Sequence, residues 1–189
     1  MVCFSEYYTG TIDNKNITYG KYGIGFKDNW IKRKKIHEVL YVERDSIIAE
    51  ALASLLRARR KKAEVQLSED VRDSIITIKC FTKNTVGYNS YFNVPNFIFR
   101  NENEFRYVPT KQQIKGNLIS CSKTKYLAKK DFYNQKLLPY SLKFSLSDLR
   151  FIFVETEEQK EEIMQMLPFQ ASLIIISNWS TDLKKQVTH

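Results

Sequence analysis

The apolar residues of this sequence recur with two different periods, which predicts short strands mixed with helices. In residues 21–26 the large apolar residues occupy every second position, as in a strand packed on one face. Between Asp45 and about Lys62 they instead follow the period of a helix, and this is the longest helix predicted. Its apolar stripe consists of Ile48, Leu52, Leu55 and Leu56.

Similar patterns, together with capping and proline signals, predict the remaining elements. Further strands are expected at residues 1–4, 37–42, 89–94, 96–100, 104–108, 150–154 and 172–176, with Pro95 separating two of them. Helices are expected from Asp28 or Asn29 to residue 35, at residues 123–134, and from Thr156 to residue 167. A helix capped by Ser68 is ambiguous after residue 75, where strand and helix fit equally well. These elements predict a single α+β domain over residues 1–189.

The composition is that of a folded protein of the cytoplasm. Of the 189 residues 43% are hydrophobic and 27% charged, which excludes a disordered chain. No apolar run approaches the roughly 18–20 residues that cross a membrane, and the first residues lack the features of a signal peptide. Cys3, Cys80 and Cys121 are widely spaced, and His37 and His189 are the two histidines. We therefore expect reduced thiols, no disulfide framework and no metal site.

The net charge of +9 is concentrated in the middle of the chain. Residues 100–150 carry 11 Lys and Arg against 4 Asp and Glu, a net charge of +7. Basic stretches run from Arg57 to Lys62 and from Lys123 to Lys130. Such an excess is typical of proteins that bind a polyanion, so nucleic acid is one candidate partner through these two stretches. An ordinary solvated surface explains the same stretches equally simply.

The stretch NENEFRYVP, residues 101–109, holds the candidate chemistry. On a strand, Glu102, Glu104 and Arg106 would share one face, while Phe105 and Tyr107 would point to the core on the other. One reading is a solvent-facing edge strand with a Glu–Arg pair. The other is a pair of catalytic carboxylates on one face of an internal strand, which opens on a cleft bordered by the strand at residues 22–26. One carboxylate would stabilise an oxocarbenium-like transition state, and the second would activate the acceptor.

Five segments of the sequence resemble a family of bacterial phage-defence proteins. They are VCFSE, YGKYGIGFKDNW, HEVLYV, ENEFRYVP and LKFSLSDLRFIFVETEEQKEEI. Their order and spacing are similar to those of the AbiGi-like abortive-infection proteins. The resemblance implies a role in phage resistance as the antitoxin-like member of a two-gene system, and therefore a protein partner from the same system.

More distantly, the layout resembles the ADP-ribosyltransferase fold, which implies a mixed β-sheet core with flanking helices and NAD as cofactor. Carried over, Glu104 would bind the nicotinamide ribose hydroxyl and stabilise the cation, while Glu102 would orient the acceptor. Tyr19 or Tyr22, on the glycine-rich strand, would line the nicotinamide pocket, and Arg106 is grouped with them as a candidate cofactor-binding residue.

Two departures from these families bear on activity. Phe105 stands where the AbiGi-like pattern has tryptophan, and the first residues of this sequence lack the His-Phe-Thr-like element that precedes the Cys-Phe strand. These departures imply one of three alternatives: the domain is inactive by itself, another chain completes it, or it continues upstream. The sequence is consistent with three functions. They are a partner-binding defence protein, an active NAD-dependent ADP-ribosyltransferase with Glu104 at its centre, and a basic nucleic-acid-binding module.

Overall fold

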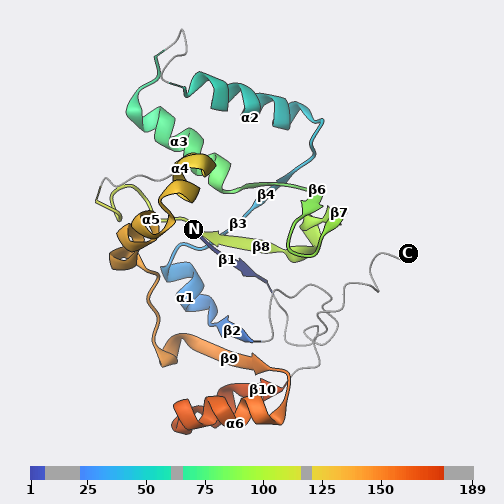
Figure 1. The fold of residues 1–189 in the computed structure, drawn as a ribbon, viewed down its shortest axis with the longest axis vertical. Coiled ribbons are helices and arrows are strands. Elements are labelled where there is room, and N and C mark those ends of the chain that lie inside the picture. Colours follow the sequence, from blue (N-terminus) through green and yellow to red (C-terminus); the bar gives the residue numbers. More distant parts are fainter. Residues whose placement is uncertain (7–21, 61–65, 116–120, 177–189) are drawn as a thin grey trace.

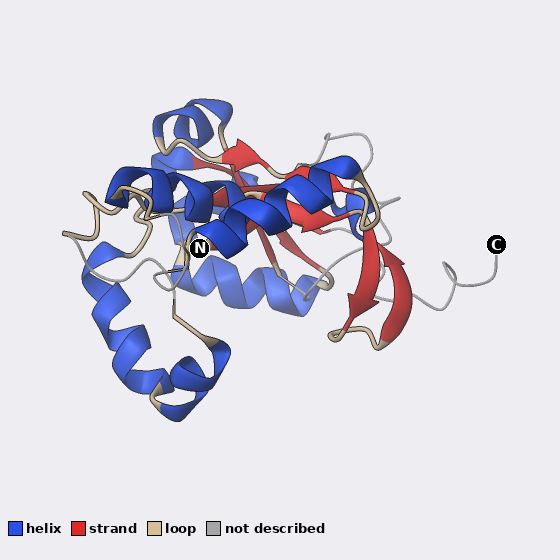
Figure 2. Cartoon of the chain, turned by 90° about the horizontal axis from the view of Figure 1, so that it is seen from above, coloured by secondary structure: helices blue, strands red, loops and turns tan. Residues whose placement is uncertain are grey.

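A computed structural model describes residues 1–6, 22–60, 66–115 and 121–176. It is an α+β fold in which the described strands form four small sheets, two of three strands and two of two. Figure 1 shows α2 and α3 at one end and β9, β10 and α6 at the other. In Figure 2 helices lie on both sides of the strands, and one two-stranded hairpin stands apart. The α+β class is confirmed, while an ADP-ribosyltransferase-like core is not.

The first three-stranded sheet has β8 (Glu104–Tyr107) at its centre, between β1 (Val2–Ser5) and β3 (His37–Glu38). Both neighbours pair with β8 in the antiparallel direction. Arg106 faces Cys3 on one side and His37 on the other, and Glu104 faces Ser5. The expectation that Glu104 stands on an internal strand is therefore confirmed.

The second three-stranded sheet is mixed. Its central strand β9 (Leu149–Val154) pairs in parallel with β10 (Ile174–Ile176) and in the antiparallel direction with β2 (Gly23–Phe26). The predicted strand at 172–176 is thus two residues shorter, because Ser172 and Leu173 belong to a 3₁₀ helix, η5 (Pro168–Leu173). Helix α6 (Glu157–Met166) connects β9 to η5 and is capped, as expected, by the Thr156 hydroxyl, which accepts from the Gln159 N–H. Four buried residues form the core of this layer: Leu149, Ile152, Val154 and Ile174.

An aromatic cluster connects the two three-stranded sheets. The Phe26 ring, at the end of β2, stacks on Trp30 with ring centroids 4.0 Å apart, and Trp30 is 1% exposed. Phe4 of β1 and Phe144 both meet the Phe26 ring edge-on, at centroid distances of 5.9 and 5.1 Å. Trp30 lies on α1 (Asp28–Arg33), so this short helix is held in place by its single buried side chain. The N-cap of α1 is Lys27 rather than Asp28 or Asn29, which corrects the predicted start.

A helical pair separates two parallel strands, β4 (Leu40–Val42) and β5 (Thr82–Asn84). Helix α2 (Ile47–Ala58) is capped by Ser46 and is shorter than predicted. Helix α3 (Glu69–Cys80) starts, as expected, after Ser68, and it remains helical through the ambiguous segment up to Cys80. The chain then turns at Phe81 directly into β5.

Two further predictions are corrected in the middle of the chain. Pro95 lies inside β7 (Val94–Ile98), which pairs with β6 (Val86–Asn89) in a two-stranded sheet. Since each strand of such a pair has an open edge, a residue without an N–H is tolerated there. The helix predicted at 123–134 is two helices, α4 (Lys123–Ala128) and α5 (Lys130–Leu137), because the backbone of Lys129 is not helical, with φ −143°. Among the described residues, the other 3₁₀ helices are η2 (Phe99–Glu102), η3 (Leu138–Tyr140) and η4 (Leu146–Asp148).

Gly25 provides a test of the contact between β2 and β9. A methyl group at this position would overlap the ring of Phe151, which is buried and packs beside Phe153. We expect Gly25→Ala to lower the free energy of unfolding by roughly 1–3 kcal/mol, as overpacking of a core does. Gly87→Ala is the matched control, since its methyl group would lie 3.2 Å from the Phe99 ring and require a smaller adjustment. Chemical denaturation of both variants measures the difference, and equal stability would contradict the described packing.

Candidate functional site

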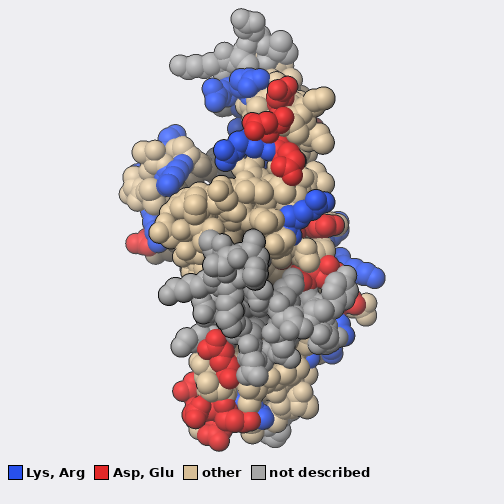
Figure 3. Space-filling model, turned by 90° about the vertical axis from the view of Figure 1, so that its right-hand side faces the viewer, with Lys and Arg blue, Asp and Glu red and all other residues tan. Residues whose placement is uncertain are grey.

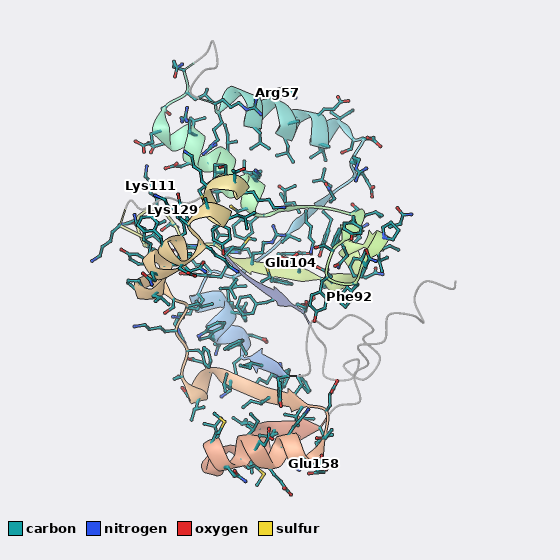
Figure 4. All side chains as sticks on the ribbon, viewed as in Figure 1. Arg57, Phe92, Glu104, Lys111, Lys129 and Glu158 are labelled. Carbon is teal, nitrogen blue, oxygen red and sulfur yellow. The ribbon has the colours of Figure 1, made fainter. Side chains whose placement is uncertain are left out.

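The candidate residues Glu102, Glu104 and Arg106 come together in a buried cluster with Lys83. Glu102 and Glu104 are each 4% exposed, and Arg106 is 8% exposed. They come from η2 and β8, while Lys83 lies on β5. Figure 4 labels Glu104 near the middle of the molecule, on β8. We call these four residues the charge cluster.

Lys83 joins the two carboxylates. Its Nζ donates to Glu104 Oε2 at 2.6 Å and also donates to Glu102 Oε2. The same ammonium group lies 4.6 Å from the centroid of the Phe99 ring, so an aromatic face covers it on another side. A single cation therefore neutralises the repulsion between two carboxylates that the sequence places two residues apart.

Arg106 holds Glu104 with a two-pronged contact. Its Nε donates to Glu104 Oε1 at 2.7 Å and its Nη2 donates to Oε2 at 3.2 Å. The remaining nitrogen, Nη1, donates to the backbone carbonyls of Cys80 and Thr82, at 2.5 and 3.3 Å. Because Cys80 is the last residue of α3, the guanidinium also satisfies a carbonyl at the negative end of that helix. Arg106 thus ties β8 to the junction between α3 and β5.

The backbone around Glu104 explains why both carboxylates converge. Asn103 has φ 44°, a left-handed conformation, so the chain turns sharply between η2 and β8. The Glu104 N–H donates to the Tyr41 hydroxyl at 2.9 Å, and the Glu104 carbonyl accepts from the Val39 N–H at 3.0 Å. The alternation predicted that Glu102 and Glu104 share one strand, and this is wrong, because Glu102 belongs to η2. The turn at Asn103 nevertheless lets both side chains reach Lys83.

The orientation of β8 differs from the prediction. Glu104 and Arg106 are buried, whereas Phe105 and Tyr107 are only half-buried, so the charged face is the more enclosed one. The strand Gly23–Phe26 pairs with β9 in the other sheet and does not border β8. The prediction that this strand borders a cleft beside Glu102 and Glu104 is therefore wrong. Tyr22, immediately before that strand, is 52% exposed, and Tyr19 lies outside the described residues.

The interactions within the charge cluster shift the pKa values of Glu104, Lys83 and Arg106 toward the charged forms. Burial opposes ionisation of Glu104, but hydrogen bonds from Arg106, Cys3 and Lys83 outweigh it and lower the pKa of that carboxyl to about 2. Burial likewise opposes the charge on Lys83, yet its hydrogen bonds to Glu102 and Glu104 raise the pKa of the ammonium group. Burial and the neighbouring Glu104 raise the pKa of Cys3 to about 11. Near neutral pH, Glu104 and Lys83 are therefore charged, and the thiol of Cys3 beside them is uncharged.

The arrangement is suited to holding elements together more than to presenting a reactive carboxylate. Both oxygens of Glu104 accept hydrogen bonds from cationic side chains. A ribose hydroxyl approaching this carboxylate would have to displace Lys83 or Arg106. Within the described ranges no group of three or more His, Cys, Asp or Glu side chains is placed to hold a metal ion.

Sequence reasoning missed Lys83, Cys3 and Tyr41. Lys83 is one of 30 basic residues, and nothing in its neighbours marks it as different. Cys3 was assigned only a reduced thiol, and Tyr41 only a place on a strand. Cys3 reaches Glu104 because β1 pairs with β8, and the local residue pattern does not indicate that long-range pairing.

Comparison with known proteins assigns the chain to a class: it matches a family of phage-resistance antitoxins. The match covers residues 1–155 of the 189, so the chain belongs to this family, which is described as "Putative abortive phage resistance protein AbiGi, antitoxin". The resemblance to the AbiGi-like abortive-infection proteins is thereby confirmed. Neither a curated protein nor a solved structure matches the chain. In the part of the chain that the structure describes, no helix has the length and apolar character that crossing a bilayer requires.

The pKa of Glu104 predicts how stability depends on pH. Its ordinary value of 4.5 falls to about 2 in the folded protein, so its contribution is complete above pH 4.5 and is lost as the pH falls toward 2. The difference corresponds to about 3 kcal/mol in the free energy of unfolding. We expect denaturation midpoints to drop steeply across this range in the wild type. In Glu104→Gln the drop should be shallower, whereas the exposed Glu161→Gln should behave like the wild type. An unchanged acid dependence in Glu104→Gln would contradict the described ion pairs.

Proposed function

We propose that this protein acts as an antitoxin by binding its toxin directly, as one folded protein recognising another. The observation that carries the proposal is the engagement of Glu104 by Lys83 and Arg106 at both carboxylate oxygens. A carboxylate used in this way stabilises the fold that presents a binding surface. Family membership supports the antitoxin role, and the family description supplies no reaction.

The energetics of buried ion pairs favour this division of roles. Removing one partner of a buried pair costs about 3–5 kcal/mol, because the other charge remains uncompensated. Replacing both partners by neutral groups of similar size is far less costly. A pair that serves the fold can therefore be replaced together without loss of function, whereas a catalytic carboxylate cannot.

The alternative is the NAD-dependent ADP-ribosyltransferase reading, with Glu104 as the catalytic carboxylate and Glu102 orienting the acceptor. The observation that favours it is the convergence of both carboxylates on Lys83. In that case Arg106 would help to bind the cofactor, together with Tyr19 or Tyr22. Neutralising Glu104 would then lower turnover by roughly 10²–10³-fold, as the loss of one electrostatic stabiliser does.

A paired substitution separates the two readings. In Glu104→Gln with Arg106→Gln the two amides can hydrogen-bond to each other, and Lys83 keeps Glu102 as its counter-charge. The variant also loses the Arg106 contacts to the Cys80 and Thr82 carbonyls. At temperatures where circular dichroism shows it folded, we expect it to co-purify with the product of the neighbouring gene and to rescue growth from it as the wild type does. Glu104→Gln alone should lose stability first and rescue only at temperatures where circular dichroism shows it folded.

The matching chemical measurement is nicotinamide release from NAD by the wild type and the paired variant, with calorimetric titration of NAD. We expect neither binding nor release. Two results together would overturn the proposal in favour of the transferase. The wild type would release nicotinamide robustly while the paired variant does not, and the folded paired variant would fail to rescue growth.

A second candidate function is nucleic-acid binding, favoured by the surface of α4 and α5. Four lysines between residues 123 and 130 are exposed, and the first turn of α4 contains no acidic residue. They are Lys123, Lys125, Lys129 and Lys130. Figure 4 places Lys129 and Lys111 on the same side of the molecule, but Lys111 is already paired with Glu69 and Asp73. Of the other basic stretch, Arg57 is exposed, whereas Lys61 and Lys62 lie outside the described residues.

Salt dependence tests this second candidate. If the lysines of α4 and α5 bind phosphates, affinity for a duplex should fall steeply with salt, because each contact releases counterions. Changing Lys125, Lys129 and Lys130 to Ala together should weaken binding and flatten that dependence. The control variant changes three exposed lysines elsewhere, Lys32, Lys79 and Lys143, and so alters the net charge equally. Affinity that does not vary with salt, or an equal loss in both variants, would count against a site on α4 and α5.

A further inference from the structure

Helix α2 carries an apolar face that the described fold leaves open. None of its residues is buried. Ile47 is 85% exposed, Ile48 62% and Leu55 43%, and Ala51 between them is also exposed. On a helical wheel these four residues lie within about 100° of one another. They form one continuous surface, which we call the α2 face.

The α2 face is distinct from the side of the helix that packs on α3. Leu52 and Leu56 are half-buried and lie on the adjacent flank of the wheel, and α3 is the element with which α2 chiefly makes contact. Figure 1 shows α2 at the outer end of the molecule. The apolar stripe predicted from the sequence is therefore wider than the part that α3 covers. A helix of this length is marginal unless its apolar surface is packed.

The charges at the two ends of α2 are of opposite sign. Residues 43–50 contain three acidic residues, Glu43, Asp45 and Glu50, against one basic residue, Arg44. Residues 57–60 contain three arginines and no acidic residue. The Nε of one of them, Arg59, is buried without a hydrogen-bond partner among the described residues. Figure 3 shows acidic and basic side chains close together at the end of the molecule formed by α2 and α3.

We propose that the α2 face binds the α2 face of a second copy of this chain, with the two helices antiparallel about a two-fold axis near Ala51. Counting four residues each way from Ala51 places Ile47 opposite Leu55 of the second copy. Counting six places Asp45, just before the helix, at the level of Arg57, whose guanidinium donates to Ser54 at the edge of the α2 face. The small side chain at the centre lets the helices approach closely, and each acidic end meets a basic end.

Self-complementarity is the reason to choose a second copy as the occupant. A uniformly acidic partner would match only the arginine end, and a uniformly basic partner only the other. A parallel copy would place like charges together, whereas the antiparallel copy also opposes the two helix dipoles. The interface is independent of toxin binding, and the experiment below contains no toxin.

The test is the mass of the full chain in solution, measured by light scattering and sedimentation over a range of concentrations. We expect a concentration-dependent dimer, and a monomer when Ile48 and Leu55 are both changed to Glu. Met166→Glu is the matched control, because Met166 is 75% exposed on α6 and should leave the dimer intact. Circular dichroism verifies that each variant is folded. A wild type that remains monomeric up to about 100 µM, or a dimer that survives the Ile48 and Leu55 changes, would overturn the proposal.

Charge reversal tests the antiparallel arrangement itself. Asp45→Arg places two cations together at both ends of the interface, and Arg57→Glu places two anions together. Each change should weaken dimerisation roughly tenfold. The double variant restores opposite charges across the interface and should recover the wild-type affinity. Loss in both single variants without recovery in the double variant would show that the helices do not pair in this way.

Discussion

The fold around β8 depends on neutralising charge away from water. Glu104 is 4% exposed, and an isolated carboxylate at such a site would be strongly disfavoured. Arg106 and Lys83 remove that penalty, and in doing so each connects β8 to another part of the chain. The guanidinium reaches the last carbonyl of α3, and the ammonium group reaches Glu102 in η2. The electrostatic requirement of one side chain thus determines how a strand, a helix end and a 3₁₀ turn are joined.

Antitoxin function fits a molecule organised in this way, because recognition requires fixed surfaces more than a reactive centre. The two ends of the molecule differ in character. The first turn of α6 is acidic, and acidic side chains gather at that end in Figure 3, whereas acidic and basic side chains are mixed at the end formed by α2 and α3. Between these ends, the aromatic cluster joins the two three-stranded sheets, and the charge cluster joins β8 to β5 and to the end of α3. A protein with differently charged ends can present separate surfaces to separate partners.

Residue patterns predicted the local structure well and the long-range contacts poorly. A period of two placed Glu104 and Arg106 on one face of a strand, and capping signals located the starts of α3 and α6, because these depend on neighbours in sequence. Lys83 could not be found in this way, since it meets Glu104 only after α3 and β5 have folded against β8. The turn at Asn103 also escaped prediction, although asparagine is among the residues that most often adopt the left-handed conformation. The burial of the two faces of β8 was also predicted wrongly. Alternation shows that the two faces of a strand differ, but the elements packed on each face decide which one is enclosed.

The aromatic cluster has a consequence for the order of folding. Phe4, Phe26, Trp30 and Phe144 meet in one place, although they are spread over most of the family match at residues 1–155. Contacts between residues so far apart in sequence close large loops, which slows folding. Synthesis proceeds from the N-terminus, so the first strand and α1 exist long before Phe144 is available to cover them. The aromatic cluster, and with it the connection between the two three-stranded sheets, can therefore close only after residue 144 has been synthesised.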